Sequence, residues 1–133
     1  MIIKGIICSS LKSASSNIKL QKKYFKGLPF IRRLYDGTIN LNISPRKFIV
    51  KKADFVFRSI HWGPLTEDFD FIPIRQINSG RGRVSITGYL YLPSLSPNRY
   101  GGTVLEIWTE WIDNITAGEI MEIKIPDNRL EIK

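Results

Sequence analysis

The chain contains few of the residues that build disulfides, zinc sites and histidine-based active sites. Cys8 is the only cysteine and His61 the only histidine among 133 residues. An internal disulfide and a cysteine-rich zinc site are therefore excluded. A catalytic triad or a histidine metal site would have to use His61, whose neighbours predict a turn. The single cysteine favours a reducing, cytoplasmic compartment.

The sequence also lacks a long hydrophobic run and a P-loop. The apolar start, MIIKGIICSS, is interrupted by Lys4 and Gly5 and is too short for a signal-peptide core or a membrane span, so no membrane partner is expected. No G-x-x-x-x-G-K-[ST] motif is present, which excludes Walker-type nucleotide binding. With 43% hydrophobic residues, the chain is expected to form one domain over residues 1–133.

Acidic residues are scarce in the first half of the chain. Residues 1–60 contain 13 Lys or Arg and two Asp, a net charge of +11. Residues 61–133 contain 7 basic and 10 acidic residues, a net charge of −3. The basic half is suited to phosphate groups, either those of a nucleotide or those of nucleic acid. A solvated basic surface is the alternative interpretation.

The order of the predicted elements favours a mainly β domain. We expect a first strand in IIKGIICSS and a helix in NIKLQKKYFKG, which starts after a serine N-cap and ends at Gly27. Further strands are predicted near 38–43, 54–60, 69–77, 83–92, 103–109 and 119–125. Many short strands without a regular alternation of strand and helix predict a small closed barrel.

The stretch LYDGTINLNI, residues 34–43, raises the question of a binding site. Thr38 and Asn40 alternate with the apolar Ile39 and Leu41, which is the pattern of a half-buried strand. Threonine is common on the solvated face of a strand, but asparagine is unfavourable in strands. The polar face of this strand is therefore either an ordinary outer surface or a functional site.

Two loops are candidates for binding phosphate. The small residues from Ser9 to Asn17 lie between a predicted strand and a predicted helix, where backbone N–H groups can receive a phosphate. A serine-rich loop that only caps the helix is the alternative. The segment NSGRGR, residues 78–83, offers Arg81 and Arg83 to a nucleic-acid backbone, or forms an exposed hairpin tip.

Two further segments contain carboxylates. In LEIWTEWID, Glu106 and Trp108 share one face of a predicted strand and could receive a flat ring that carries a polyol, although a tryptophan in the core is the alternative. TEDFDF, residues 66–71, is interpreted either as a divalent-cation cluster or as a turn that enters a strand, and the turn is favoured.

Six segments follow one another in an order that resembles a known family. They are MIIKGIICSS, YDGTINLNI, TEDFDF, GYLYLP, TVLEI and ITAGEIMEIKI. In this order, over nearly the whole chain, the sequence resembles the archaeal CTP-dependent riboflavin kinases. The resemblance implies a small closed six-stranded cradle-loop barrel with one or two short helices. It also implies phosphoryl transfer from CTP to riboflavin, which gives FMN, with Mg²⁺ as cofactor.

The resemblance also assigns roles to individual residues. Thr38 and Asn40, in the run Gly-Thr-hydrophobic-Asn, would bind Mg²⁺. Glu106 would bind the flavin and, as the catalytic residue, orient or deprotonate the attacking hydroxyl, and Ser96 is the nearest equivalent of a flavin-contacting threonine. The loop after the first strand would bind the pyrimidine nucleotide; its residues are Ser10, Leu11, Lys12, Ser13, Ala14 and Ser15.

Two segments differ from the family. The family has a G-x-G-x-G-type loop where this chain has SLKSAS, and a basic segment where this chain has the shorter, acidic WTEWIDNITAG. An acidic segment repels phosphates, and a loop with fewer glycines has a different shape, so we expect weak nucleotide binding. The alternative function is a non-catalytic barrel module that binds nucleic acid, a nucleotide or another polyanion through its basic N-terminal half.

Overall fold

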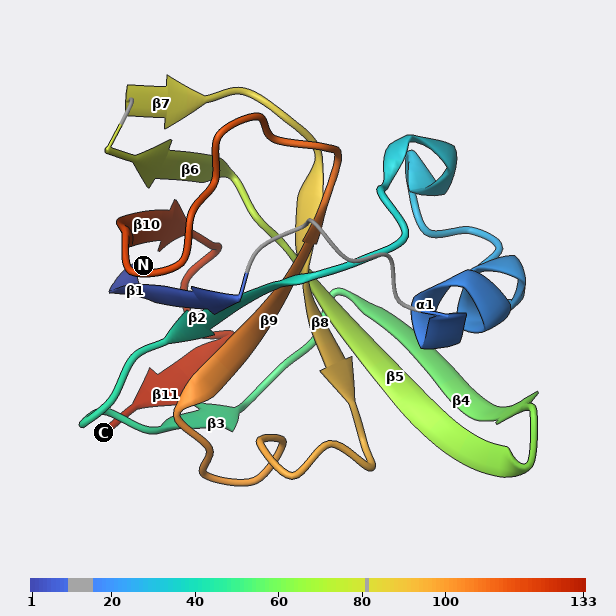
Figure 1. Cartoon of the computed structure of the whole chain (residues 1–133). Coiled ribbons are helices and arrows are strands. Elements are labelled where there is room, and N and C mark those ends of the chain that lie inside the picture. Colours follow the sequence, from blue (N-terminus) through green and yellow to red (C-terminus); the bar gives the residue numbers. More distant parts are fainter. Residues whose placement is uncertain (10–15, 81) are drawn as a thin grey trace.

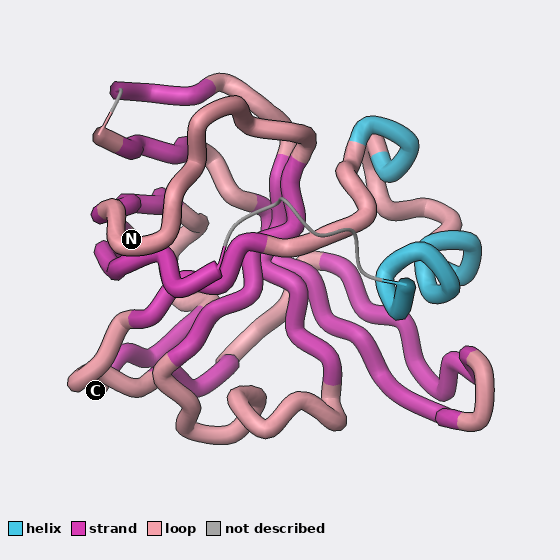
Figure 2. Tube along the Cα trace, viewed as in Figure 1, coloured by secondary structure: helices cyan, strands magenta, loops and turns pink. Residues whose placement is uncertain are grey.

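The computed structural model describes residues 1–9, 16–80 and 82–133, and these form a mainly β fold (Figure 1). The helical elements are α1 (Ser16–Gln21) and the 3-10 turns η1 (Lys22–Tyr24) and η2 (Ile31–Arg33). They gather on one side of the strands (Figure 2). The strands are β1 (Ile2–Ser9), β2 (Ile39–Asn42), β3 (Phe48–Val50), β4 (Phe55–Trp62), β5 (Leu65–Pro73), β6 (Gln76–Ser79), β7 (Gly82–Val84), β8 (Gly88–Pro93), β9 (Val104–Thr109), β10 (Ile120–Lys124) and β11 (Leu130–Ile132). None of the helices in these ranges has the length and apolar character needed to span a bilayer.

Nine strands form one antiparallel sheet in the order β4-β5-β8-β9-β2-β1-β10-β6-β7, and β11 and β3 form a second, small sheet. β5 and β6 lie near opposite ends of this order, although only Ile74 and Arg75 separate them in the chain. Ile74 N–H donates to Gly88 O at 2.9 Å and Arg75 N–H donates to Lys124 O at 2.7 Å. The sheet is therefore strongly curled, because its two ends are joined by two residues.

Several predicted boundaries need correction. The strand predicted at 69–77 begins earlier, at Leu65, and is divided into β5 and β6. TEDFDF is consequently part of β5 and not a turn, because β4 on one side and β8 on the other pair with its backbone. The strand predicted at 83–92 is divided into β7 and β8, the helix ends at Gln21, and the pair β3–β11 was not predicted.

Two hydrophobic cores lie on opposite faces of the same strands. In β8, Leu90 and Leu92 point to one face, and Tyr89 and Tyr91 point to the other. The aliphatic core contains Ile3, Ile7, Ile39, Leu41, Leu90, Leu105 and Ile107, among others. The aromatic core contains Phe25, Phe69, Phe71, Tyr89, Tyr91 and Trp108, with Ile18, Leu28 and Leu34 from the helical segment. The segment from α1 to residue 34 thus covers the second face of the sheet, which explains why β8 is buried throughout.

Candidate functional site

A row of side chains runs across four strands on the face that carries the aromatic core. Asn40 pairs with Glu106, Glu106 with Tyr91, and Tyr91 with Phe71. Residues that are directly opposite in antiparallel strands share one face and lie close together. The row therefore changes from polar in β2 and β9 to aromatic in β8 and β5.

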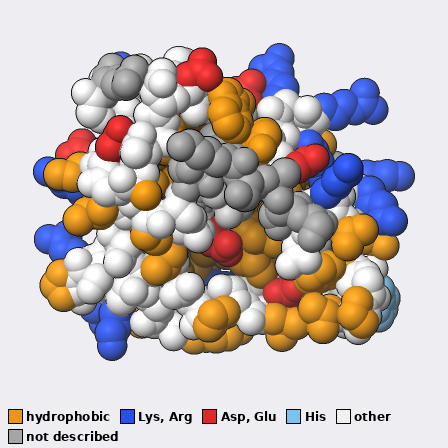
Figure 3. Space-filling view, in the orientation of Figure 1, with side chains coloured by type: hydrophobic (Ala, Val, Ile, Leu, Met, Phe, Trp, Pro, Cys, Tyr) orange, Lys and Arg blue, Asp and Glu red, His pale blue; other side chains and the backbone are white. Residues whose placement is uncertain are grey.

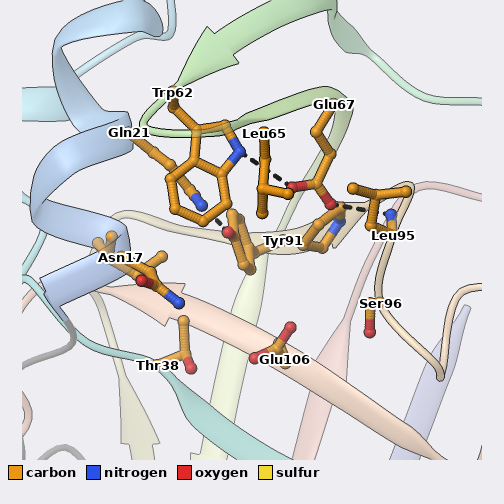
Figure 4. A pocket seen from close by; sticks show the side chains of 12 residues that line it. Asn17, Gln21, Thr38, Trp62, Leu65, Glu67, Tyr91, Leu95, Ser96 and Glu106 are labelled. Carbon is orange, nitrogen blue, oxygen red and sulfur yellow. Dashed lines mark hydrogen bonds between the residues drawn. The ribbon is translucent and has the colours of Figure 1, made fainter.

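A cavity of about 280 Å³ lies along this row, between α1, the β4–β5 hairpin and the segment that follows β8 (Figure 4). Its apolar lining includes Trp62, Leu65, Tyr91 and Leu95. Its polar lining consists of Asn17, Gln21, Thr38, Glu67, Ser96 and Glu106. Thr38, Ser96 and Glu106, which come from distant parts of the sequence, are thus brought to one cavity, and we call this cavity the pocket.

Glu67 joins two walls of the pocket. Its side chain accepts a hydrogen bond from Trp62 Nε1 at 3.1 Å and one from Leu95 N–H at 2.8 Å. Only 6% of Glu67 is exposed, so both oxygen atoms are used by the protein and little by water. The carboxylate fixes the hairpin end that carries Trp62 to the segment that carries Ser96.

Burial in the pocket favours the neutral forms of Glu106 and Tyr91. Burial raises the pKa of Glu106, the charge of Glu67 raises it further, and a hydrogen bond with the Thr38 side chain lowers it. Burial also raises the pKa of Tyr91, with smaller contributions from Glu106 and Glu67. The Tyr91 hydroxyl donates to Gln21 Oε1, which connects β8 to α1.

Asn40 has a buried oxygen that no protein group satisfies. Its Oδ1 is the only buried amide oxygen without a hydrogen-bond partner in the ranges described. Asn40 lies opposite Glu106 in the neighbouring strand, and Thr38 lines the pocket together with Glu106, so residues with hydroxyl, amide and carboxylate oxygens are neighbours; Asn40 itself is not among the residues that line the pocket. Hard oxygen atoms of this kind are the ligands that Mg²⁺ prefers. The residues present therefore fit the predicted metal.

Apart from Glu67, the remaining residues that the sequence suggested for a site do not line the pocket or lie outside the described residues. Trp108 belongs to the core, as the alternative interpretation held: it is fully buried and its Nε1 donates to Tyr35 O at 2.6 Å. The acidic residues of TEDFDF do not form a cation cluster, and no such group of His, Cys, Asp and Glu occurs in the described part of the chain. The predicted nucleotide-binding residues 10–15, and Arg81 of the NSGRGR segment, lie outside the described residues.

Sequence analysis missed Trp62, Tyr91 and Gln21 as pocket residues, and considered Glu67 only as part of a cation cluster or turn. One signal was available: the alternation in GYLYLP places Tyr89 and Tyr91 on a shared face. The contributions of Trp62 and Gln21 depend on contacts between distant segments, which periodicity does not show.

Comparison with known proteins adds no relative: no protein-family model matches the chain, and no match is found among curated proteins. The chemistry of the pocket must therefore be inferred from its residues. A partly buried carboxylate, a hydroxyl and an amide oxygen lie beside aromatic and aliphatic walls. Such a site can accept protons and receive a ligand with one flat apolar part and one hydroxylated part.

Proposed function

We propose that this protein is a riboflavin-kinase-like phosphotransferase. It would transfer the terminal phosphoryl group of a nucleoside triphosphate, CTP by the sequence resemblance, to riboflavin and produce FMN. The observation that carries the proposal is the position of Glu106, which lines an aromatic-walled pocket together with Thr38 and pairs across the strands with Asn40, whose buried oxygen has no partner among the described residues.

We further propose that the curled sheet closes into the six-stranded cradle-loop barrel that the resemblance implies. The closing strand would be the bent segment β5–β6, followed by β8, β9, β2, β1 and β10 in the order of pairing. The hydrogen bonds of Ile74 and Arg75 to Gly88 and Lys124 support this proposal, because they continue the pairing across the bend.

The pocket suits the two chemical parts of riboflavin. Trp62, Leu65, Tyr91 and Leu95 offer aromatic and aliphatic surface to a flat ring system. Ser96 and Glu106 offer a hydroxyl and a carboxylate to the ribityl hydroxyls. The volume of about 280 Å³ is at the lower end of small-molecule pockets, which hold roughly 300–1,000 Å³.

In the proposed reaction Glu106 is the general base. It would take the proton of the terminal ribityl hydroxyl while that oxygen forms a bond to the terminal phosphorus. The bond from this phosphorus to its bridging oxygen would break, and the nucleoside diphosphate would leave with the electron pair. Burial raises the pKa of Glu106 above that of an exposed glutamate, so its carboxylate is a stronger base.

Thr38 and Asn40 would bind Mg²⁺ with their hydroxyl and amide oxygens. When bound, the ion would supply positive charge next to the phosphate groups of the nucleotide. The hydrogen bond between Thr38 and Glu106 would orient the base relative to this site. The buried Asn40 Oδ1 would then gain the partner that the described residues do not supply.

The proposal is tested by direct assay. The purified protein is incubated with riboflavin, Mg²⁺ and, in parallel, CTP, UTP, ATP or GTP, and the products are separated by chromatography with fluorescence detection. We expect FMN to form with at least one nucleotide and not after chelation of the metal. If riboflavin binds but no nucleotide yields FMN, the protein is a binding module and the kinase proposal is wrong.

A further inference from the structure

An exposed basic segment lies on the far side of the helical cover from the aromatic core. Residues 19–33 contain six basic and no acidic side chains. Lys22 has a structural role, because its Nζ donates to Leu34 O at 2.7 Å and pairs with Asp36 at 3.1 Å. The other five are exposed and form no ion pair with the described residues; they are Lys19, Lys23, Lys26, Arg32 and Arg33.

Phe30 projects from this segment in an unusual conformation. Its backbone is left-handed, with φ 60° and ψ 23°, and 58% of the residue is exposed. A non-glycine residue in this region is strained, and an exposed phenylalanine gains little from burial to offset the strain. The Arg33 guanidinium lies 4.8 Å from the centre of the Phe30 ring, so an aromatic surface and a cation are placed side by side.

The exposed ring stands on a fixed base. Leu28 and Leu34, which flank it in the chain, are 2% and 3% exposed and belong to the aromatic core. Tyr89 donates a hydrogen bond to the carbonyl oxygen of Pro29 at 2.7 Å. The protein therefore fixes the backbone that carries the ring before any ligand arrives, which reduces the entropic cost of binding.

We propose that residues 19–33 form a binding surface for single-stranded nucleic acid. Phe30 would stack on an unpaired base, and the five free cations would contact backbone phosphates, which is how sequence-tolerant single-strand binding is achieved. Lys and Arg side chains gather at the edge of the molecule where the helical segment lies (Figure 3). The surface is separate from the pocket, so this inference does not depend on the proposed kinase activity.

The packing of the segment argues against membrane binding. A helix that lies on a bilayer needs an outward apolar face. Ile18, Phe25, Leu28 and Leu34 instead face inward and are buried in the aromatic core. The exposed large hydrophobic residues of the segment are Leu20 and Phe30, too few to form such a face. A duplex is also a poorer ligand than a single strand, because its bases are already stacked on one another and leave no face for Phe30.

The test uses fluorescence anisotropy of the full chain with labelled 12-nucleotide oligo(dT) and oligo(U) at several salt concentrations. We expect binding whose log–log salt slope is about −3.5, from five phosphate contacts at about 0.7 each. A duplex of the same length should bind more weakly. A duplex that binds more tightly than the single strand would overturn the stacking role.

Phe30→Asn isolates the contribution of the ring. Asparagine tolerates the left-handed conformation, so the variant should melt at or above the temperature of the wild type. Its affinity for the oligonucleotides should fall about 5- to 150-fold, the loss of one stacked base, while Phe30→Tyr should bind like the wild type. Unchanged affinity in Phe30→Asn would overturn the proposal.

A charge variant tests the phosphate contacts. Arg32→Ala combined with Arg33→Ala should reduce the salt slope by about 1.4. The matched control, Arg46→Ala with Lys47→Ala, removes the same charge from exposed residues outside the segment and should leave the slope unchanged. Equal effects of both pairs on the salt slope would overturn the proposal. Displacement of the oligonucleotide by stoichiometric CTP would also overturn it. So would binding to phosphatidylserine vesicles that is tighter than binding to the oligonucleotides and is abolished by Phe30→Asn.

Discussion

The aliphatic core and the aromatic core lie on opposite faces of the same strands, and they differ in their polar atoms. Leu90 and Leu92 in the first core carry none, so they pack wherever the curled sheet places them. Tyr89, Tyr91 and Trp108 in the second core carry O–H or N–H groups that need partners. These partners are Pro29 O and Gln21 Oε1, in the segment that covers the sheet, and Tyr35 O, directly after it.

The difference indicates that the two cores have separate roles. The aliphatic core stabilises the sheet itself, because most of its side chains come from strands. The aromatic core attaches the helical segment to the sheet and ends at the pocket, where Tyr91 is both a core residue and a lining residue. The fold should therefore depend mainly on the first core, and ligand binding mainly on the second.

Truncation of one large side chain in each core should separate these roles. Leu90→Ala should lower the free energy of unfolding by about 2–5 kcal/mol, and Phe25→Ala by about 3–5 kcal/mol. Phe25 is fully buried, with its ring centre 4.9 Å from that of Phe69 and 5.0 Å from that of Phe71, so its loss should undock the helical segment first. Denaturant titration measures the first effect and hydrogen exchange the second.

In Phe25→Ala we expect amides of α1 to exchange faster while those of β1, β2 and β10 stay protected, and riboflavin binding to be lost. In Leu90→Ala all these amides should lose protection together. The same pattern of exchange in both variants would contradict the separation of roles.

Two tryptophans allow a matched test of the pocket wall. Trp62→Phe leaves the buried Glu67 Oε1 without its indole donor and should lower the free energy of unfolding by about 1–3 kcal/mol. Trp111 also donates to a carboxylate, Asp113 Oδ1 at 2.8 Å, but it is 49% exposed. Trp111→Phe should therefore change stability by about 0.5 kcal/mol or less. Thermal unfolding of both variants measures these changes. An equal loss of stability in both would show that Glu67 does not fix the pocket wall that carries Trp62.

The smallest effect concerns pH. The folded protein raises the pKa of Glu106 above its value in the unfolded chain, so the folded state binds the proton more tightly. Ionisation of Glu106 therefore lowers stability as the pH rises above about 4.3, the ordinary pKa of glutamate. Glu106→Gln has no such loss and should be more stable than the wild type at pH 7, with the difference disappearing below pH 4. Melting curves across this range check the prediction, and a variant that is less stable at pH 7 would contradict it.

Local patterns predicted those parts of the fold that depend on neighbouring residues. Alternation identified the strand at 39–42 and placed Thr38 and Asn40 on its polar face, since Ile39 and Leu41 are fully buried. The bend at Ile74 was not predictable, because its hydrogen bonds go to Gly88 and Lys124, which are distant in sequence. Pairing between such segments is not encoded in any short window.

The candidate site likewise contains residues that the sequence predicted and residues that depend on contacts between distant segments. Among the described residues the family resemblance named Thr38, Asn40, Ser96 and Glu106; Thr38, Ser96 and Glu106 line the pocket, whereas Asn40 is not among its lining residues. Sequence patterns could not show that Glu67 bonds both Trp62 and Leu95, because this arrangement requires the hairpin and the segment after β8 to meet.

The central claim is that Glu106 acts on a hydroxyl of riboflavin, and single-turnover formation of FMN by the wild type and Glu106→Gln tests it most directly. We predict that the substitution lowers the rate by about 10²- to 10⁴-fold, the usual contribution of a general base. Riboflavin affinity, measured by fluorescence quenching, should change little, and Glu119→Gln outside the pocket should match the wild type. A Glu106→Gln variant that forms FMN at the wild-type rate would contradict the account.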